Sequence, residues 1–149
     1  MSVAHLFLGF DGRISRSPFW LGLLFVIAIE IAVTLALGVP FFPKELSPLP
    51  VRLKDFAIQL ILLYPITAIM VKRLHDRDYP GIYAAWVVGL MLLVLFTDLA
   101  GVTGDPENLT WLDYLLGVLT LVVGLAFLID LGCRRGTPGD NRFGPEPFS

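Results

Sequence analysis

The sequence of 149 residues has one cysteine, few charges and no motif typical of a catalytic or cofactor site. Cys133 alone excludes an intrachain disulfide and a metal site built from several thiolates. Charged residues make up 16% of the chain, whereas hydrophobic residues make up 56% and the mean hydropathy is +0.76. This composition excludes an ordinary soluble domain and indicates an integral membrane protein. We expect a protein without enzymatic activity, cofactor, metal site or nucleic-acid partner.

Four long apolar segments predict the fold. They cover residues 19–39, 56–71, 81–99 and 111–131. At about 1.5 Å of rise per residue, three of them match the hydrocarbon thickness of about 30 Å that a spanning helix must cross. The second is shorter, and the amphipathic stretch 51–55 can serve as its outer turn. The sequence therefore predicts a single all-α membrane domain, an antiparallel four-helix bundle with a short cytoplasmic arm and a docked C-terminal tail.

Lysine and arginine are unevenly distributed between the connections. Eight lie in the N-terminal arm, the connection between the second and third segments, and the C-terminal tail, whereas three lie in the connection between the first and second segments. Because cytoplasmic loops carry the excess of basic residues, both termini are predicted to be cytoplasmic. The eight basic residues are Arg13, Arg16, Lys72, Arg73, Arg77, Arg134, Arg135 and Arg142.

Three short polar motifs fall on this predicted cytoplasmic side. They are Gly-Arg-Ile-Ser-Arg at 12–16, Lys-Arg-Leu-His-Asp-Arg at 72–77, and Gly-Thr-Pro-Gly-Asp-Asn-Arg-Phe-Gly-Pro at 136–145. In the predicted topology they lie close together in space. With the flanking residues from Phe10 to Trp20, the motifs resemble those of a family of small bacterial inner-membrane proteins, the proteins of the YhaH kind. The resemblance covers essentially the whole chain, and it implies a fold and an inner-membrane location but no activity.

The acidic and basic residues of these motifs are candidate partners for one another. Because an arginine guanidinium matches a carboxylate geometrically, we expect Asp76 and Asp130 to anchor arginines and to clip the segments together. A phosphate-bearing ligand in the same basic pocket is the functional alternative, with Asn141 beside it. His75 next to Asp76 is also a candidate for acid–base chemistry. The candidate arginines are Arg13, Arg16, Arg73 and Arg142.

Glu30 is the conspicuous charge inside an apolar segment. It lies eleven positions into the first predicted helix and is therefore expected near the membrane midplane. A carboxylate at that depth is costly, and an intramembrane ionisable group is a candidate functional residue. The less costly arrangement is a protonated group, or a hydrogen bond to Gln59, Tyr64 or Thr67 on the next helix.

The sequence favours a non-enzymatic membrane module that presents a basic cytoplasmic face. Its expected partners are membrane lipids with anionic headgroups, a phosphorylated ligand, a protein partner or a second copy of the chain. The first alternative is a small transporter or proton-linked channel with Glu30 in its path. The second is a membrane enzyme that acts on lipid phosphate groups through His75 and Asp76.

Overall fold

The computed structural model describes residues 2–41, 43 and 45–147, and over this range it contains helices and no strand. An all-α fold is therefore confirmed. The short helix α1 (Val3–Leu8) precedes the long helices α2 (Arg16–Ala36) and α3 (Leu49–Asp76). The chain continues as the 3₁₀ turn η1 (Gly81–Tyr83), α4 (Ala84–Ala100), α5 (Trp111–Phe127) and the π-helix η2 (Leu128–Cys133).

Four of these helices are long and apolar enough to cross a membrane: α2, α3, η1 with α4, and α5 with η2. Two predicted boundaries were wrong. The first helix begins at Arg16 and ends at Ala36. It ends early because Gly38, two residues later, adopts a left-handed conformation (φ 66°). The second is longer at both ends and includes the amphipathic stretch that precedes residue 56. At about 1.5 Å per residue it measures about 42 Å, so its ends reach beyond the hydrocarbon layer.

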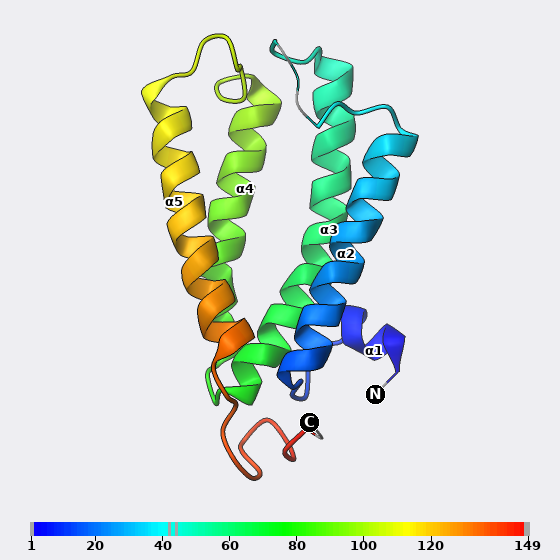
Figure 1. The fold of residues 1–149 in the computed structure, drawn as a ribbon, viewed down its shortest axis with the longest axis vertical. Helices are drawn as coiled ribbons and strands as arrows, with labels where there is room; N and C mark the ends of the chain where they lie inside the picture. Colours follow the sequence, from blue (N-terminus) through cyan, green and yellow to red (C-terminus); the bar gives the residue numbers. More distant parts are fainter. Residues whose placement is uncertain (1, 42, 44, 148–149) are drawn as a thin grey trace.

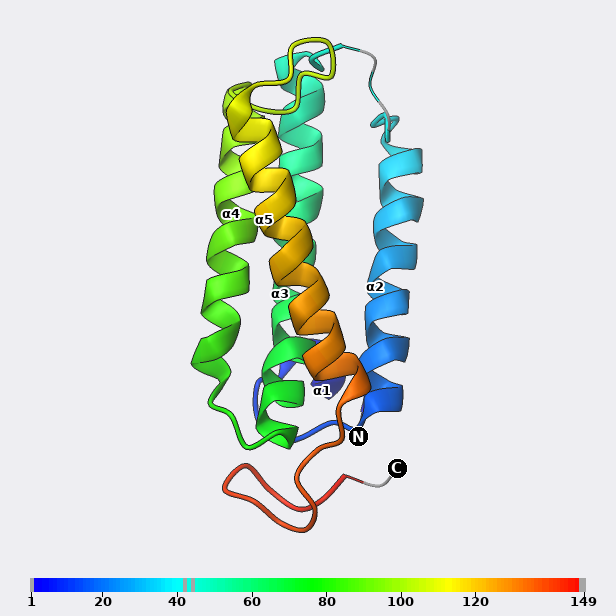
Figure 2. The ribbon, with the colours of Figure 1, turned by 60° about the vertical axis from the view of Figure 1, so that its left-hand side comes forward.

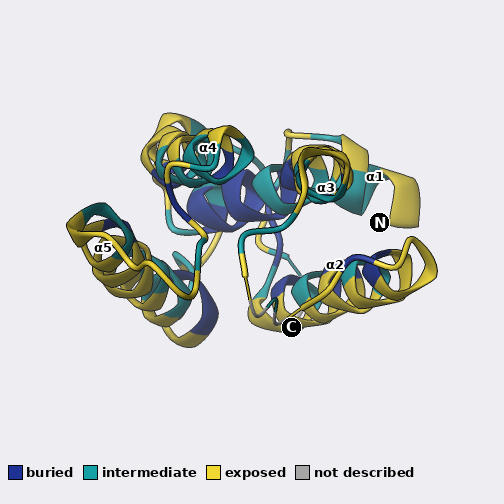
Figure 3. Ribbon diagram, turned by 90° about the horizontal axis from the view of Figure 1, so that it is seen from above, coloured by how far each residue is buried: buried dark blue, intermediate teal, exposed yellow. Residues whose placement is uncertain are grey.

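Consecutive long helices run in opposite directions, and both termini lie at one end of the molecule, which we call the terminal end (Figure 1). The opposite end, the loop end, carries the connections between α2 and α3 and between α4 and α5. The helix α3 packs against both α2 and α4, and α5 packs against α4. At the terminal end η2 packs against α2 (Figures 2 and 3). The helices thus lie in the order α2, α3, α4 and α5, each against the next, and at the terminal end η2 joins the last to the first.

The apolar core lies in the terminal half. Side chains of α2, α3, α4 and η2 form one buried cluster, and Ile14 from the arm before α2 is completely buried in it. The short helix α1 adds Leu6 and Phe7 to this cluster. The core therefore supports the end of the molecule where the three polar motifs meet.

At the start of α5, Thr110 and Asp113 form a capping box, as their spacing predicts.

Candidate functional site

Four charged side chains are buried at the terminal end. Lys72 is fully buried, and Arg73, Asp76 and Arg13 are 1%, 3% and 7% exposed. Three belong to the last turns of α3, and Arg13 belongs to the arm that leads into α2. Charged groups are almost never buried to this degree unless they are paired and hydrogen-bonded. Their partners therefore decide what this end of the molecule does.

Asp76 holds two arginines at once. Arg13 donates to Asp76 Oδ1 from Nε at 3.2 Å and from Nη2 at 3.0 Å. Arg73, one turn earlier on α3, donates from Nη1 to Asp76 Oδ2. We call Arg13, Arg73 and Asp76 the Asp76 clip. The carboxylate compensates both cations and ties the arm before α2 to the end of α3.

Backbone carbonyls of the C-terminal tail accept the other hydrogen bonds of the Arg13 guanidinium. Its Nη2 donates to the carbonyl of Thr137 at 2.7 Å, and Nη1 donates to the carbonyls of Gly139 at 2.7 Å and Gly144 at 3.2 Å. Thr137 in turn donates from its backbone N–H, at 2.8 Å, and from its hydroxyl, at 3.1 Å, to the carbonyl of Asp76. The tail folds back across the terminal end (Figure 2), and its carbonyls surround the Arg13 guanidinium.

Arg73 satisfies the carbonyls at the end of η2. It donates from Nε to the carbonyl of Leu131 at 2.5 Å and from Nη2 to that of Arg134 at 2.6 Å. Trp20 Nε1 donates to Gly132 O at 3.1 Å, and Arg16 Nη1 donates to Cys133 O at 3.3 Å. Carbonyls at the end of a helix have no partner within it. Side chains from α2 and α3 supply those partners and thereby fix the last spanning helix to the first two.

The His75 side chain contacts the arm before α2 and the tail, and not Asp76. Its Nδ1 donates to the carbonyl of Gly12 at 3.1 Å, and its ring stacks on Phe143 with 3.9 Å between centroids. Asn141 Nδ2 donates to the carbonyl of His75 at 2.9 Å. The His75 and Asp76 side chains therefore have different partners, and they do not form the acid–base pair that the enzymatic alternative requires.

Asp130 binds arginines as expected, but the arginines expected for it were wrong, as was the partner expected for Arg142. Asp130 pairs with Arg77 and Arg134, each at 3.1 Å, because it lies in η2 beside the end of α3 and one turn before Arg134. Arg142 pairs with Asp78 at 3.2 Å. These pairs are more exposed than the Asp76 clip, so they contribute less to stability.

Lys72 is a structural residue, whereas its place in the sequence indicated only the membrane topology. Its Nζ donates to the carbonyls of His5, Leu6 and Gly9 at 2.5, 2.6 and 2.7 Å. The lysine thus binds the end of α1 and holds this short helix against α3. Its burial depends on the packing of α1 against α3, where residues 68–74 are all buried, and the sequence alone carried no signal of it.

Glu30 does not have the surroundings that were expected. It lies six residues before the end of α2, about 9 Å from the loop end of this helix, because the helix begins and ends earlier than predicted. Tyr64 donates to the carbonyl of Leu8 at 3.0 Å, Gln59 to Asp55 at 2.7 Å and Thr67 to the carbonyl of Leu63. None of the three bonds Glu30, and the described residues offer its carboxylate no other hydrogen bond.

An open pocket of about 580 Å³ lies at the terminal end beside the Asp76 clip. Arg16 and Arg135 line it, and both are exposed. Arg135 has no ion pair or hydrogen bond within the described part of the chain. Glu146 also lines the pocket, where it accepts a hydrogen bond from the backbone N–H of Gly139 at 2.6 Å. We call this pocket, with Ser15, Arg16, Arg135 and Thr137 in its wall, the terminal pocket.

The described residues contain no group of three His, Cys, Asp or Glu side chains placed to hold a metal ion. The site is instead a set of arginines and a lysine bound to carboxylates and backbone carbonyls, below four helices that can span a membrane. The chain is therefore a membrane protein whose terminal end is held together by buried charge.

Comparison with known proteins identifies the family. Residues 7–145 match the family described as "Protein of unknown function (DUF805)", and the chain belongs to this family. It is 32% identical to "Uncharacterized protein YiiR" of Escherichia coli (strain K12) over 98% of this chain and 90% of that protein. It is 26% identical to "Inner membrane protein YhaH" and 29% identical to "Inner membrane protein YhaI" of the same strain, each over 99% of this chain and 93% and 92% of those proteins. No solved structure matches the chain. The family resemblance read from the three motifs is confirmed.

Proposed function

We propose that the chain is a non-enzymatic module of the bacterial inner membrane whose terminal end faces the cytoplasm and binds the phosphate of an anionic lipid headgroup. The observation that carries the proposal is the division of the basic residues into two groups. Arg13, Lys72 and Arg73 are buried and fully used in holding the fold. Arg16 and Arg135 are exposed and line the terminal pocket; within the described part of the chain Arg16 makes one hydrogen bond, to the carbonyl of Cys133, and Arg135 makes none, so both keep donors for a ligand.

The depth of the terminal pocket favours a lipid over a soluble phosphate. Arg16 is the first residue of α2, and Arg135 follows directly after the end of the last spanning helix. Both side chains therefore lie where the spanning helices leave the hydrocarbon layer, at the level of the headgroups. A basic residue near an anionic membrane surface contributes about 1 kcal/mol to the attraction.

The transporter alternative finds less support. It requires a continuous polar path from Glu30 to both ends of the molecule. One turn closer to the terminal end on α2, Val26 is 1% exposed and packs in the apolar core with Ile69 and Met70. Apolar side chains therefore fill the space between Glu30 and the terminal end.

Lipid retention tests the proposed function. The intact protein is placed in nanodiscs of phosphatidylcholine with a minor fraction of phosphatidylglycerol, and the lipids that stay bound after gentle release are counted by native mass spectrometry. We expect phosphatidylglycerol to be enriched and Arg135→Gln to weaken its binding about fivefold, as the loss of about 1 kcal/mol implies. Arg134→Gln is the matched control, because this neighbouring arginine pairs with Asp130 and does not line the pocket.

Each outcome of this experiment is informative. Equal retention by Arg135→Gln and the native chain would contradict the proposal. Binding of soluble glycerol phosphate in the absence of phosphatidylglycerol would assign the pocket to a free ligand. A mass of two chains without bound lipid would favour a second copy as the partner.

The proposed orientation has its own test. We expect a reporter fused to the C-terminus to act in the cytoplasm, because eight basic residues lie at the terminal end and three at the other. In a Cys133→Ser background, a cysteine at position 105 in the connection between α4 and α5 should react with an impermeant thiol reagent from outside the cell. Labelling of that cysteine only after the membrane is opened would contradict the proposed orientation and indicate the opposite one.

A further inference from the structure

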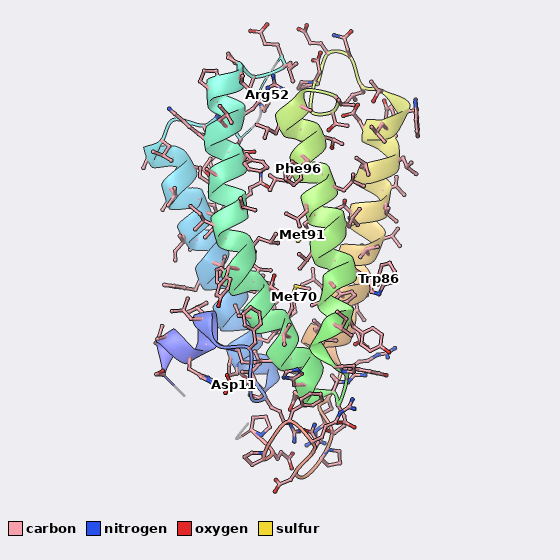
Figure 4. The ribbon with its side chains drawn as sticks, turned by 180° about the vertical axis from the view of Figure 1, so that it is seen from behind. Asp11, Arg52, Met70, Trp86, Met91 and Phe96 are labelled. Carbon is pink, nitrogen blue, oxygen red and sulfur yellow. The ribbon has the colours of Figure 1, made fainter. Side chains whose placement is uncertain are left out.

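The loop end contains a cavity of about 320 Å³ that the proposed function does not use. It lies between the outer turns of α2, α3 and α4 and the connections that follow them; Arg52 marks its position in Figure 4. Its wall carries three acidic residues, Glu30, Asp55 and Asp98, and among the described residues one basic residue, Arg52. If all four groups are ionised, the described wall is negatively charged.

Two polar groups on the α2 side of this cavity have no partner. The Glu30 carboxylate makes no hydrogen bond or ion pair within the described part of the chain. Thr34, one turn further along α2, lines the same cavity, is 5% exposed, and has no hydrogen bond to its hydroxyl among the described residues. Residues four apart on a helix share a face, so both groups line the cavity from the same side. The hydroxyl is therefore free to accept a hydrogen bond from a ligand that enters the cavity.

The other charged groups of the cavity each make hydrogen bonds, although Arg52 Nε is buried without a partner of its own. Asp55 accepts a hydrogen bond from Gln59 at 2.7 Å, and Asp98 accepts one from the Thr103 hydroxyl. Arg52 Nη1 donates to the carbonyls of Asp98 at 3.3 Å and Leu99 at 2.8 Å, where it binds the end of α4 and not a carboxylate. The positive charge of Arg52 is therefore held on the α4 side, and Glu30 is left uncompensated on the α2 side.

The chemistry of the wall selects the ligand. The described residues offer no cluster of three metal-ligating side chains, so the negative charge does not form a metal cage. The aromatic rings of Phe41 and Phe56 line the cavity, and aromatic faces attract organic cations. An ammonium group that carries N–H donors can bond the Glu30 carboxylate and the Thr34 hydroxyl together. The volume lies at the lower end of the range for ligand pockets, which favours a small molecule.

We propose that the loop-end cavity binds a small primary amine in its ammonium form, held by the Glu30 carboxylate and the Thr34 hydroxyl and enclosed by Phe41 and Phe56. This binding site is at the opposite end of the molecule from the terminal pocket. The amine enters the cavity from the loop end, so its binding requires no passage through the membrane.

Butylamine is a suitable probe, used on the detergent-solubilised full chain at constant ionic strength with binding measured by calorimetry. We expect saturable binding, and we expect tetramethylammonium, which has the charge but no N–H donor, to bind at least tenfold more weakly. Butanol, which lacks the charge, should not bind measurably. Glu30→Gln should weaken butylamine binding about tenfold or more, since a hydrogen bond to a charged group is lost.

Matched variants separate the site from the surrounding charge. Thr34→Val keeps the volume and removes the hydroxyl, and it should weaken butylamine binding severalfold. Glu107→Gln makes the same chemical change as Glu30→Gln on the same end of the molecule, outside the cavity, and should leave binding unchanged. No saturable binding, equal binding of tetramethylammonium, or binding unaffected by Glu30→Gln and Thr34→Val would each overturn the proposal.

Discussion

Asp76→Ala should lower the free energy of unfolding by about 3–5 kcal/mol, which is the usual cost of leaving buried charge uncompensated. The carboxylate is shared by Arg13 and Arg73, and the side chains of both arginines are 1% exposed. Its removal therefore leaves two buried guanidinium groups with only neutral carbonyls as partners. It also loosens three segments together, because Arg13 holds the tail and Arg73 holds η2. Denaturant titration in detergent, followed by circular dichroism or tryptophan fluorescence, measures the loss.

Two other aspartates provide graded controls for this prediction. Asp78 pairs with Arg142 at the surface, where the two side chains are 47% and 58% exposed, so Asp78→Ala should cost less than about 1 kcal/mol. Asp130→Ala should fall between the two, because Arg77 keeps the carbonyl of Asp130 as a partner at 2.8 Å. Asp76→Ala and Asp78→Ala of equal stability would show that the clip does not hold the terminal end.

The four spanning helices could be predicted from hydropathy for two reasons. A helix makes its backbone hydrogen bonds within its own segment, and the bilayer requires a minimum length of apolar residues. Local signals were also sufficient for the capping box at Thr110 and Asp113, which depends on residues three apart. The ends of α2 and α3 were not predictable in this way. The last turns of α3 are charged and remain helical because partners in other segments bury and satisfy Lys72, Arg73 and Asp76.

The site was predictable only in part, for a related reason. The sequence indicated that Asp76 would bind arginines, but which arginines depends on contacts such as that of Arg13 with Asp76, which are 63 residues apart. Asp130 illustrates the limit: its pair with Arg134 is local, four residues apart, whereas its pair with Arg77 follows from how η2 lies against α3, and no local pattern reports this. The same holds for the loop-end cavity, where Glu30 and Asp55 share a wall only because α2 packs on α3.

Gly136 shows how closely the tail approaches the clip. A Cβ atom at this position would collide with the Asp76 carboxylate, so any side chain here would displace the acceptor that both arginines use. A glycine-rich tail is equally typical of a disordered terminus, but at Gly136 the glycine is required by close contact. Composition alone does not distinguish the two, whereas the position of a glycine against a buried carboxylate does.

Lys72→Met is the second substitution for which we expect a large effect, and its effect should be confined to the first segment of the chain. Methionine keeps an unbranched apolar chain but donates no hydrogen bond, so the carbonyls of His5, Leu6 and Gly9 lose their shared donor. A hydrogen bond to a charged group contributes about 1.5–3 kcal/mol. A loss of about 2 kcal/mol corresponds to a roughly thirtyfold increase in local opening. Hydrogen exchange of the Leu6 and Gly9 amides, which are bonded within α1, should accelerate by that factor.

Lys54→Met is the matched control for this release of α1. Lys54 is exposed and also donates to a backbone carbonyl, that of Leu37 at 3.3 Å, but it makes one such bond at the loop end. The same change of charge there should leave exchange in α1 unaffected. Because Leu6 and Phe7 still pack on the core, α1 in Lys72→Met should open more often without unfolding the spanning helices. Unchanged protection of the Leu6 and Gly9 amides would mean that apolar packing alone holds α1, and that the buried lysine has another role.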